Sequence, residues 1–128
     1  MIYAHPNTSG APLKFKAKYD NFIGGKWVAP TKGVYFDVVT PITGKPYTQA
    51  ARSSAEDIEL ALDAAHAAAD RWGKTSAAER GNILLKIADR SEANLELLAY
   101  AETVDNGKPI RETLNADIPL AIDHFRYF

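Results

Sequence analysis

The stretch Ala101-Glu102-Thr103-Val104-Asp105-Asn106-Gly107-Lys108-Pro109 decides how the second half of the chain folds. Gly107 can adopt the left-handed conformation that ends a helix. Pro109 suits the first position of the next helix, because the N–H that it lacks would have no partner there. Lys108 places a cation at the negative end of the first helix dipole. The stretch therefore predicts a sharp corner between two packed helices.

Residues 102–109 also resemble the Glu-Thr-x-Asp-Asn-Gly-Lys-Pro box of the aldehyde dehydrogenase superfamily. Further short boxes stand in that family's order, at residues 22–28, 38–44, 55–72, 79–80 and 125–128. Each box alone is weak evidence, and their common order makes the resemblance specific. Residues 111–121 are most similar to the bacterial acetaldehyde-type enzymes. The resemblance covers residues 21 to 128, which are identified as the N-terminal part of the family's longer chain.

The resemblance implies an α/β fold that corresponds to the N-terminal part of the aldehyde dehydrogenase fold. A small antiparallel β-hairpin and strand segment would precede a helical layer of about four to five helices. Family members oxidise an aldehyde to a carboxylic acid with NAD(P)+ through a Cys thiolate, a Glu-activated water and an Asn in the oxyanion hole. All of these groups, and the contacts to NAD, lie downstream in the family, so we expect residues 1–128 to hold no catalytic or cofactor-binding residue and to be inactive alone.

A metal site is implied by the same resemblance. Many family members bind a structural Na+ or K+ through backbone carbonyls before an Asn/Thr-Pro turn and through the Asp of the Asp-Asn-Gly box. The matching positions are Val38, Val39 and Asp105. A further ligand comes from later in the family chain. From the residues alone, Asp105 is interpreted first as helix-end and turn chemistry, and the ion-ligand role is what the resemblance implies.

Composition excludes several classes of function. The 128 residues include 15 Lys and Arg against 16 Asp and Glu, so no basic surface predicts nucleic-acid binding. Hydrophobic residues make up 46%, as in ordinary globular domains. There is no cysteine, which excludes disulfides, thiolate metal sites and a thiol nucleophile within the chain. No run reaches the roughly 18 apolar residues of a membrane span, and the sequence predicts a cytoplasmic protein.

The N-terminal part predicts an arm and a small β segment. Residues 1–20 contain no clean periodicity and are expected to form an extended arm, with a short edge strand around residues 14–18 as the alternative. Gly24 and Gly25 lie between two short runs of aromatic and β-branched residues, which predicts a tight hairpin. Strands are predicted at 35–39 and 45–52, with exposed edges that need a helix or another chain against them.

Local signals place the helices that follow. Two overlapping capping boxes, Ser53 with Glu56 and Ser54 with Asp57, predict a helix at residues 55–72. Its apolar face is predicted to pack in a helix–helix core, with a dimer interface as the alternative: Ile58, Leu62, Ala65, Ala69 and Trp72. The other charged positions of this helix, Asp57 among them, are expected to face solvent.

The remaining helices have similar signals. Ser76 and Glu79 form another capping box before a helix to about residue 92, and Asn94 is expected to cap the next turn. A short helix is predicted from Pro109 to about residue 114. Asp117 should then cap a last helix with Pro119 in its first turn. That helix still continues at Phe128, so the sequence predicts a region 21–128 that is truncated within a helix.

No chemistry-bearing cluster appears elsewhere. Gly24-Gly25 belongs to a hairpin and not to a phosphate-binding loop. The three histidines, His5, His66 and His124, have no second ligand at helical spacing and are interpreted as structural or surface residues. We expect the chain to act with the remainder of an aldehyde dehydrogenase, in a homodimer or homotetramer. The alternative is a non-catalytic helical module for interaction or oligomerisation.

Overall fold

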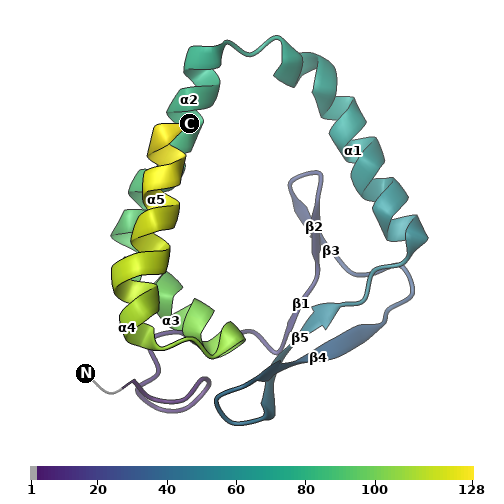
Figure 1. Ribbon diagram of the computed structural model, residues 1–128. Coiled ribbons are helices and arrows are strands. Elements are labelled where there is room, and N and C mark those ends of the chain that lie inside the picture. Colours follow the sequence, from purple (N-terminus) through teal and green to yellow (C-terminus); the bar gives the residue numbers. More distant parts are fainter. Residues whose placement is uncertain (1–2) are drawn as a thin grey trace. The chain divides into compact units, whose positions relative to one another are not determined.

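The computed structural model describes residues 3–128, in which strands come first and helices follow (Figure 1). The strands are β1 (Lys18–Tyr19), β2 (Asn21–Ile23), β3 (Lys26–Val28), β4 (Tyr35–Thr40) and β5 (Lys45–Ala51). The helices are α1 (Ala55–Gly73), α2 (Ala77–Ala93), α3 (Leu95–Asn106), α4 (Ile110–Glu112), the π-helical turn η1 (Thr113–Asp117) and α5 (Ile118–Tyr127).

These elements form two compact units. The strand unit comprises Lys16–Val39 and Pro46–Thr75, and so contains α1 and most of the strand residues. The helical unit comprises the residues up to Phe15, the turn Thr40–Lys45 and the segment Ser76–Phe128. The side chains of the apolar core lie in the helical unit: Ala88, Ala99, Tyr100, Val104 and Ile122.

The predicted hairpin is confirmed in the strand unit. β2 and β3 pair antiparallel, with Phe22 opposite Trp27. Gly24 and Gly25 have φ values of 58° and 79°, the left-handed pair that a tight two-residue hairpin turn requires. A Cβ atom on Gly24 would lie 3.8 Å from the Cβ of Ala64, so the turn packs against α1.

The sheet is mixed, whereas the sequence predicts an antiparallel segment. Its strand order is β1-β5-β4, and β1 runs parallel to β5 with Lys18 opposite Gln49 and Tyr19 opposite Ala50. A parallel pair needs a long connection between its strands, and residues 20–44 supply one. The edge strand offered as an alternative at residues 14–18 is found only at its last residue, since β1 spans Lys18–Tyr19 and residues 14–17 form no strand.

The start of α1 uses the second of the two predicted capping boxes. Ser54 is the N-cap, and Asp57 accepts a hydrogen bond from the Ser54 N–H at 2.8 Å. Asp57 also accepts from the N–H and hydroxyl of Thr31, at 2.8 and 2.7 Å. These hydrogen bonds, that from the Ser54 backbone first, lower the pKa of Asp57 to about 2. The prediction that Asp57 faces solvent is wrong: only 2% of the residue is exposed.

The predicted burial of the apolar face of α1 is also wrong within the strand unit. Ile58 is 54% exposed, Leu62 46% and Trp72 51%. The reason is one of size, since α1 has 19 residues and packs against β2, which has three. The face therefore lies open in the chain as described.

In the helical unit, α2 and α5 lie side by side and run antiparallel (Figure 1). The capping box that starts α2 is confirmed, because the Glu79 N–H donates to Ser76 Oγ and Glu79 Oε2 accepts from the Ser76 N–H. Arg126 of α5 forms ion pairs with Asp89 and Glu92 of α2. These contacts join the first and the last helix of the unit.

Asn94 and Asp117 occupy the predicted N-cap positions of α3 and α5, but neither side chain forms the cap hydrogen bond. Asn94 does not cap α3 with its side chain; its Nδ2 instead donates to the Arg90 carbonyl at 2.8 Å and closes α2. Asp117 does not cap α5, because the chain runs from α4 through η1 into α5 without a break. Asp117 itself has helical φ and ψ of −66° and −55°. A continuous helix leaves no free N–H groups for a cap to accept. Pro119 does lie in the first turn of α5, as predicted.

Candidate functional site

The helix corner at Glu102–Pro109 is the best-defined candidate site of the helical unit. Gly107 ends α3 in the left-handed conformation, with φ of 78°, and its N–H donates to the Thr103 carbonyl at 2.9 Å. Asn106 Oδ1 accepts from the Lys108 N–H at 2.8 Å, which turns the chain away from α3. The sharp corner is confirmed. Pro109, predicted at the first helical position, is one residue earlier, at the N-cap of α4.

Gly107 is required at this corner by a close contact as well as by its φ. A Cβ atom there would lie 2.7 Å from Cγ of Pro41, a separation that real side chains do not show. Pro41 belongs to the turn Thr40–Lys45 of the same unit. The end of α3 is thus packed directly on this turn, and only a glycine allows that approach.

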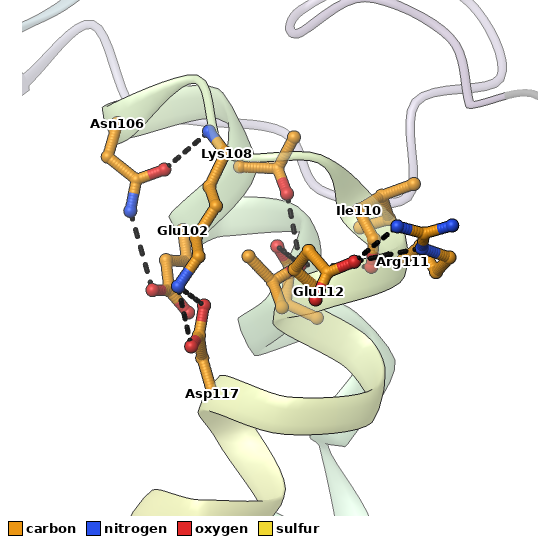
Figure 2. Close-up of polar contacts among 10 residues, drawn as sticks. Glu102, Asn106, Lys108, Ile110, Arg111, Glu112 and Asp117 are labelled. Carbon is orange, nitrogen blue, oxygen red and sulfur yellow. Dashed lines mark hydrogen bonds and ion pairs between the residues drawn. The ribbon is translucent and has the colours of Figure 1, made fainter.

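A lysine–aspartate pair spans the corner (Figure 2). Lys108 Nζ lies 2.7 Å from Oδ1 and 2.6 Å from Oδ2 of Asp117, at the end of η1. The hydrogen bond to Asp117 raises the pKa of Lys108. Lys108 was predicted to act on the dipole of α3. Its ammonium instead forms a specific bond to a partly buried carboxylate, since the Asp117 side chain is only 25% exposed.

A buried threonine forms the other polar contact between α3 and η1. Thr113, the first residue of η1, is fully buried. Its hydroxyl lies 3.1 Å from the carbonyls of Ala99 and Ile110 and 3.0 Å from the hydroxyl of Thr103. A single O–H can donate to one of these carbonyls while accepting from Thr103, so this hydroxyl is satisfied without water.

The N-terminal residues Tyr3 and Ala4 form hydrogen bonds with side chains of α3. The Tyr3 hydroxyl donates to Glu96 at 2.8 Å, and the Tyr100 hydroxyl donates to the Ala4 carbonyl at 2.8 Å. The two rings lie 5.9 Å apart. A cavity of about 200 Å³ lies beside them, with Val104 among its apolar lining residues. Burial raises the pKa of Tyr100, which stays a neutral hydrogen-bond donor.

The three predicted ion ligands are divided between the two units. Val38 and Val39 are consecutive residues of β4 in the strand unit, and Asp105 is the penultimate residue of α3 in the helical unit. The sodium or potassium site remains a prediction. Among residues 3–128, no three His, Cys, Asp or Glu side chains are grouped as a metal site would require.

The chain offers little for nicotinamide cofactor binding or for acid–base chemistry. Gly24 and Gly25 form a hairpin turn and not the strand-to-helix loop that cradles phosphates, so these residues do not fit NAD. His5, His66 and His124 are all exposed. No helix within residues 3–128 is both long and apolar enough to cross a lipid bilayer.

The sequence pattern does not indicate the Lys108–Asp117 pair, the Tyr3–Tyr100 contact or the π-turn. These features join residues that are far apart in the chain or depend on tertiary packing. The regular spacing of hydrophobic residues gives no signal for them. The box at residues 102–109 did mark the corner to which two of them belong.

The sequence model of the Aldehyde dehydrogenase family matches residues 27–128. The chain belongs to this aldehyde dehydrogenase family. The match begins within β3 and covers β4, β5 and all of the helices, including the corner.

Curated aldehyde dehydrogenases are similar to this chain over nearly its whole length. It is 71% identical to the aldehyde dehydrogenase of Deinococcus radiodurans over 98% of the chain and 24% of that protein. It is 69% identical to a long-chain-aldehyde dehydrogenase of Acinetobacter sp and 66% identical to an acetaldehyde dehydrogenase of Pseudomonas aeruginosa. Both of these matches cover 100% of the chain and 25% of the relative. The chain thus spans about a quarter of the length of its curated family relatives.

Solved structures show the same family fold. The chain matches a putative aldehyde dehydrogenase from Burkholderia cenocepacia with a TM-score of 0.84 and 40% identity, over 88% of this chain and 23% of that one. It matches PnpE in complex with nicotinamide adenine dinucleotide with a TM-score of 0.83 and 40% identity, over 85% and 22%. The predicted fold, the N-terminal part of the aldehyde dehydrogenase fold, is confirmed.

Proposed function

We propose that this chain supplies the N-terminal part of an NAD-dependent aldehyde dehydrogenase that oxidises a small, acetaldehyde-like aldehyde to its carboxylic acid. The observation that carries the proposal is the family match over residues 27–128. A similar solved structure that contains nicotinamide adenine dinucleotide supports the choice of cofactor. On this proposal the protein is cytoplasmic and forms a homodimer or homotetramer.

The chain would contribute a scaffold and not the reacting groups. It contains no cysteine, so the thiolate that attacks the aldehyde in this family's chemistry has to come from elsewhere. NAD binding would also fall to residues outside this chain. The role of the helical unit would be to hold its helices at the angle set by the Glu102–Pro109 corner.

The test of the proposed activity is NADH formation by the full-length protein. We expect a higher kcat/KM with acetaldehyde than with decanal, because residues 111–121 resemble the acetaldehyde-type enzymes. The Acinetobacter relative is named for long-chain aldehydes, so the comparison decides substrate size. Absence of NADH formation with both aldehydes would refute the proposed activity, and a preference for decanal would refute the small substrate.

We also propose the structural sodium or potassium ion, held by the carbonyls of Val38 and Val39 and by Asp105. Support comes from the helical unit, where Gly107, two residues after Asp105, packs against Pro41. Hard monovalent cations suit such oxygen ligands.

The ion predicts a cation-specific stabilisation. In the full-length protein, we expect KCl or NaCl to raise the unfolding temperature more than choline chloride of equal ionic strength, and Asp105→Ala to abolish the difference. Asp123→Ala, at an exposed position of α5, is the control that should retain it. Equal responses to all three salts in the wild type would argue against the ion.

The alternative function, a helical interaction or oligomerisation module, has one observation in its favour. Ile58, Leu62 and Trp72 are exposed on α1 and would suit an apolar partner. Circular dichroism and sedimentation of residues 1–128 distinguish the two proposals. A cooperative melt of a stable monomer would support an independent module, whereas a broad melt or aggregation would favour a part of a larger enzyme.

A further inference from the structure

The π-turn η1 is held at both of its ends by the same neighbouring helix corner. At its start, the buried Thr113 hydroxyl lies within hydrogen-bond distance of Ala99 and Thr103 of α3. At its end, both carboxylate oxygens of Asp117 lie within 2.7 Å of Lys108 Nζ (Figure 2). Asp117 Oδ2 is buried and accepts no other hydrogen bond, so the ion pair is its compensation.

A π-turn changes the direction in which every later side chain of the helix points. The Ile118 N–H bonds to the carbonyl of Thr113, five residues back, so this turn contains one residue more than an α-turn. One additional residue rotates the following helix by about 100°. Because of this rotation, the side chain of Ile122 lies in the core, and the residue is only 3% exposed. A regular α-helix from Thr113 onward would place Ala121 in that position instead.

We propose that Lys108 is a positioning residue that fixes the π-turn through Asp117 and thereby sets which face of α5 enters the core. The Thr113 contacts fix where the turn begins, and the Lys108–Asp117 bridge fixes where it ends. Without the bridge, the turn is free to relax to α geometry at the expense of Ile122 burial. The inference rests on the helical unit alone and does not depend on the proposed enzymatic activity.

The test is hydrogen exchange and crystallography of the full-length protein that carries this chain, comparing wild type with Lys108→Met. We expect the Ile118 amide to exchange roughly tenfold faster in the variant, the low end for losing a charge-assisted hydrogen bond. The low end applies because the Lys108 side chain is 44% exposed. We also expect the Ile118–Thr113 bond to be lost or replaced by an α-type bond in the crystal structure.

Three further variants separate positioning from general stability. Lys86→Met removes an exposed lysine of α2 in the same unit and should leave the Ile118 amide unchanged. Lys108→Arg keeps the cation and should hold exchange within about twofold of wild type. Deletion of Ala116 removes the additional residue, so Lys108→Met should then have little effect on the phase of α5.

Two results would overturn the proposal. One is an intact π-turn with wild-type exchange at Ile118 in Lys108→Met. The other is faster exchange spread equally over α2 and α3, which would mean that Lys108 supports overall stability and not the turn. None of these readouts uses activity, so the proposal and the proposed function can fail separately.

Discussion

Gly107 shows how much one residue can decide at the corner. It combines a left-handed φ of 78° with a site where a Cβ would meet Pro41 at 2.7 Å. Gly33 has a similar φ of 62° but open space around it. Comparing alanine substitutions at the two positions therefore distinguishes the effect of backbone strain from that of steric overlap.

We predict that Gly107→Ala destabilises the full-length protein by about 3 kcal/mol, of which backbone strain accounts for about 1–2 kcal/mol. Gly33→Ala should destabilise the protein only by the amount that backbone strain accounts for. Urea unfolding of both variants measures the difference. Equal losses of stability in the two variants would show that Pro41 moves aside without an energetic penalty.

Asp57 makes the start of α1 sensitive to acid. Its pKa in the folded chain is about 2, below the ordinary 3.8, because Ser54 and Thr31 donate hydrogen bonds to the ionised carboxylate. A lowered pKa stabilises the fold above the unfolded value and loses that contribution as the pH falls toward 2. We predict that wild type exceeds Asp57→Asn in stability by a constant amount above about pH 4, and that the difference shrinks between pH 4 and 2.

Thermal unfolding at several pH values measures that difference. Glu59→Gln, at an exposed position of the same helix, is the matched control and should follow the wild-type curve. A gap between wild type and Asp57→Asn that does not change with pH would show that the carboxylate charge is unimportant at this position.

At the scale of elements, α2 depends on the capping box at its start. Ser76 and Glu79 each accept a hydrogen bond from the other residue's backbone N–H. Ser76→Ala removes one acceptor and should destabilise the helical unit by about 1 kcal/mol, whereas Ser76→Asp should retain most of the stability. Chemical denaturation of the full-length protein checks both. An alanine variant as stable as wild type would mean that water replaces the cap.

Elements with local signals were the predictable ones. Gly24 and Gly25 marked the hairpin, and the capping boxes marked α1 and α2, because turn and cap chemistry act over a few residues. The burial of Asp57 could not be read in this way, because it depends on Thr31, which is 26 residues away. The cap predicted at Asp117 is absent for another reason, since the helix continues from α4 through η1 into α5 and leaves no free N–H groups there.

The candidate site was predictable only in part. The corner itself follows from Gly107, and the ion ligands Val38, Val39 and Asp105 came from family resemblance alone. The hydrogen bond from Tyr100 to Ala4 joins residues 96 positions apart, and no pattern in the sequence indicates it. Contacts of this length follow from the packed fold and not from local propensity.

At the scale of the whole molecule, the apolar face of α1 is exposed, with Leu62 46% accessible. On the proposed function, the remainder of an aldehyde dehydrogenase covers this face, and Leu62→Ser should then destabilise the full-length protein by about 2 kcal/mol. In residues 1–128 alone, where Leu62 is 46% exposed, the same change should cost less than about 0.5 kcal/mol. Thermal melts of both proteins compare the two values, and equal losses would show that α1 is not covered.

The central claim is that these strands and helices are a scaffold without a reactive group of their own. The most direct measurement is NADH formation from acetaldehyde and NAD, monitored at equal molar concentrations of the full-length protein and of residues 1–128. We predict turnover by the full-length protein and none by residues 1–128. Turnover by residues 1–128, which contain no cysteine, would contradict it.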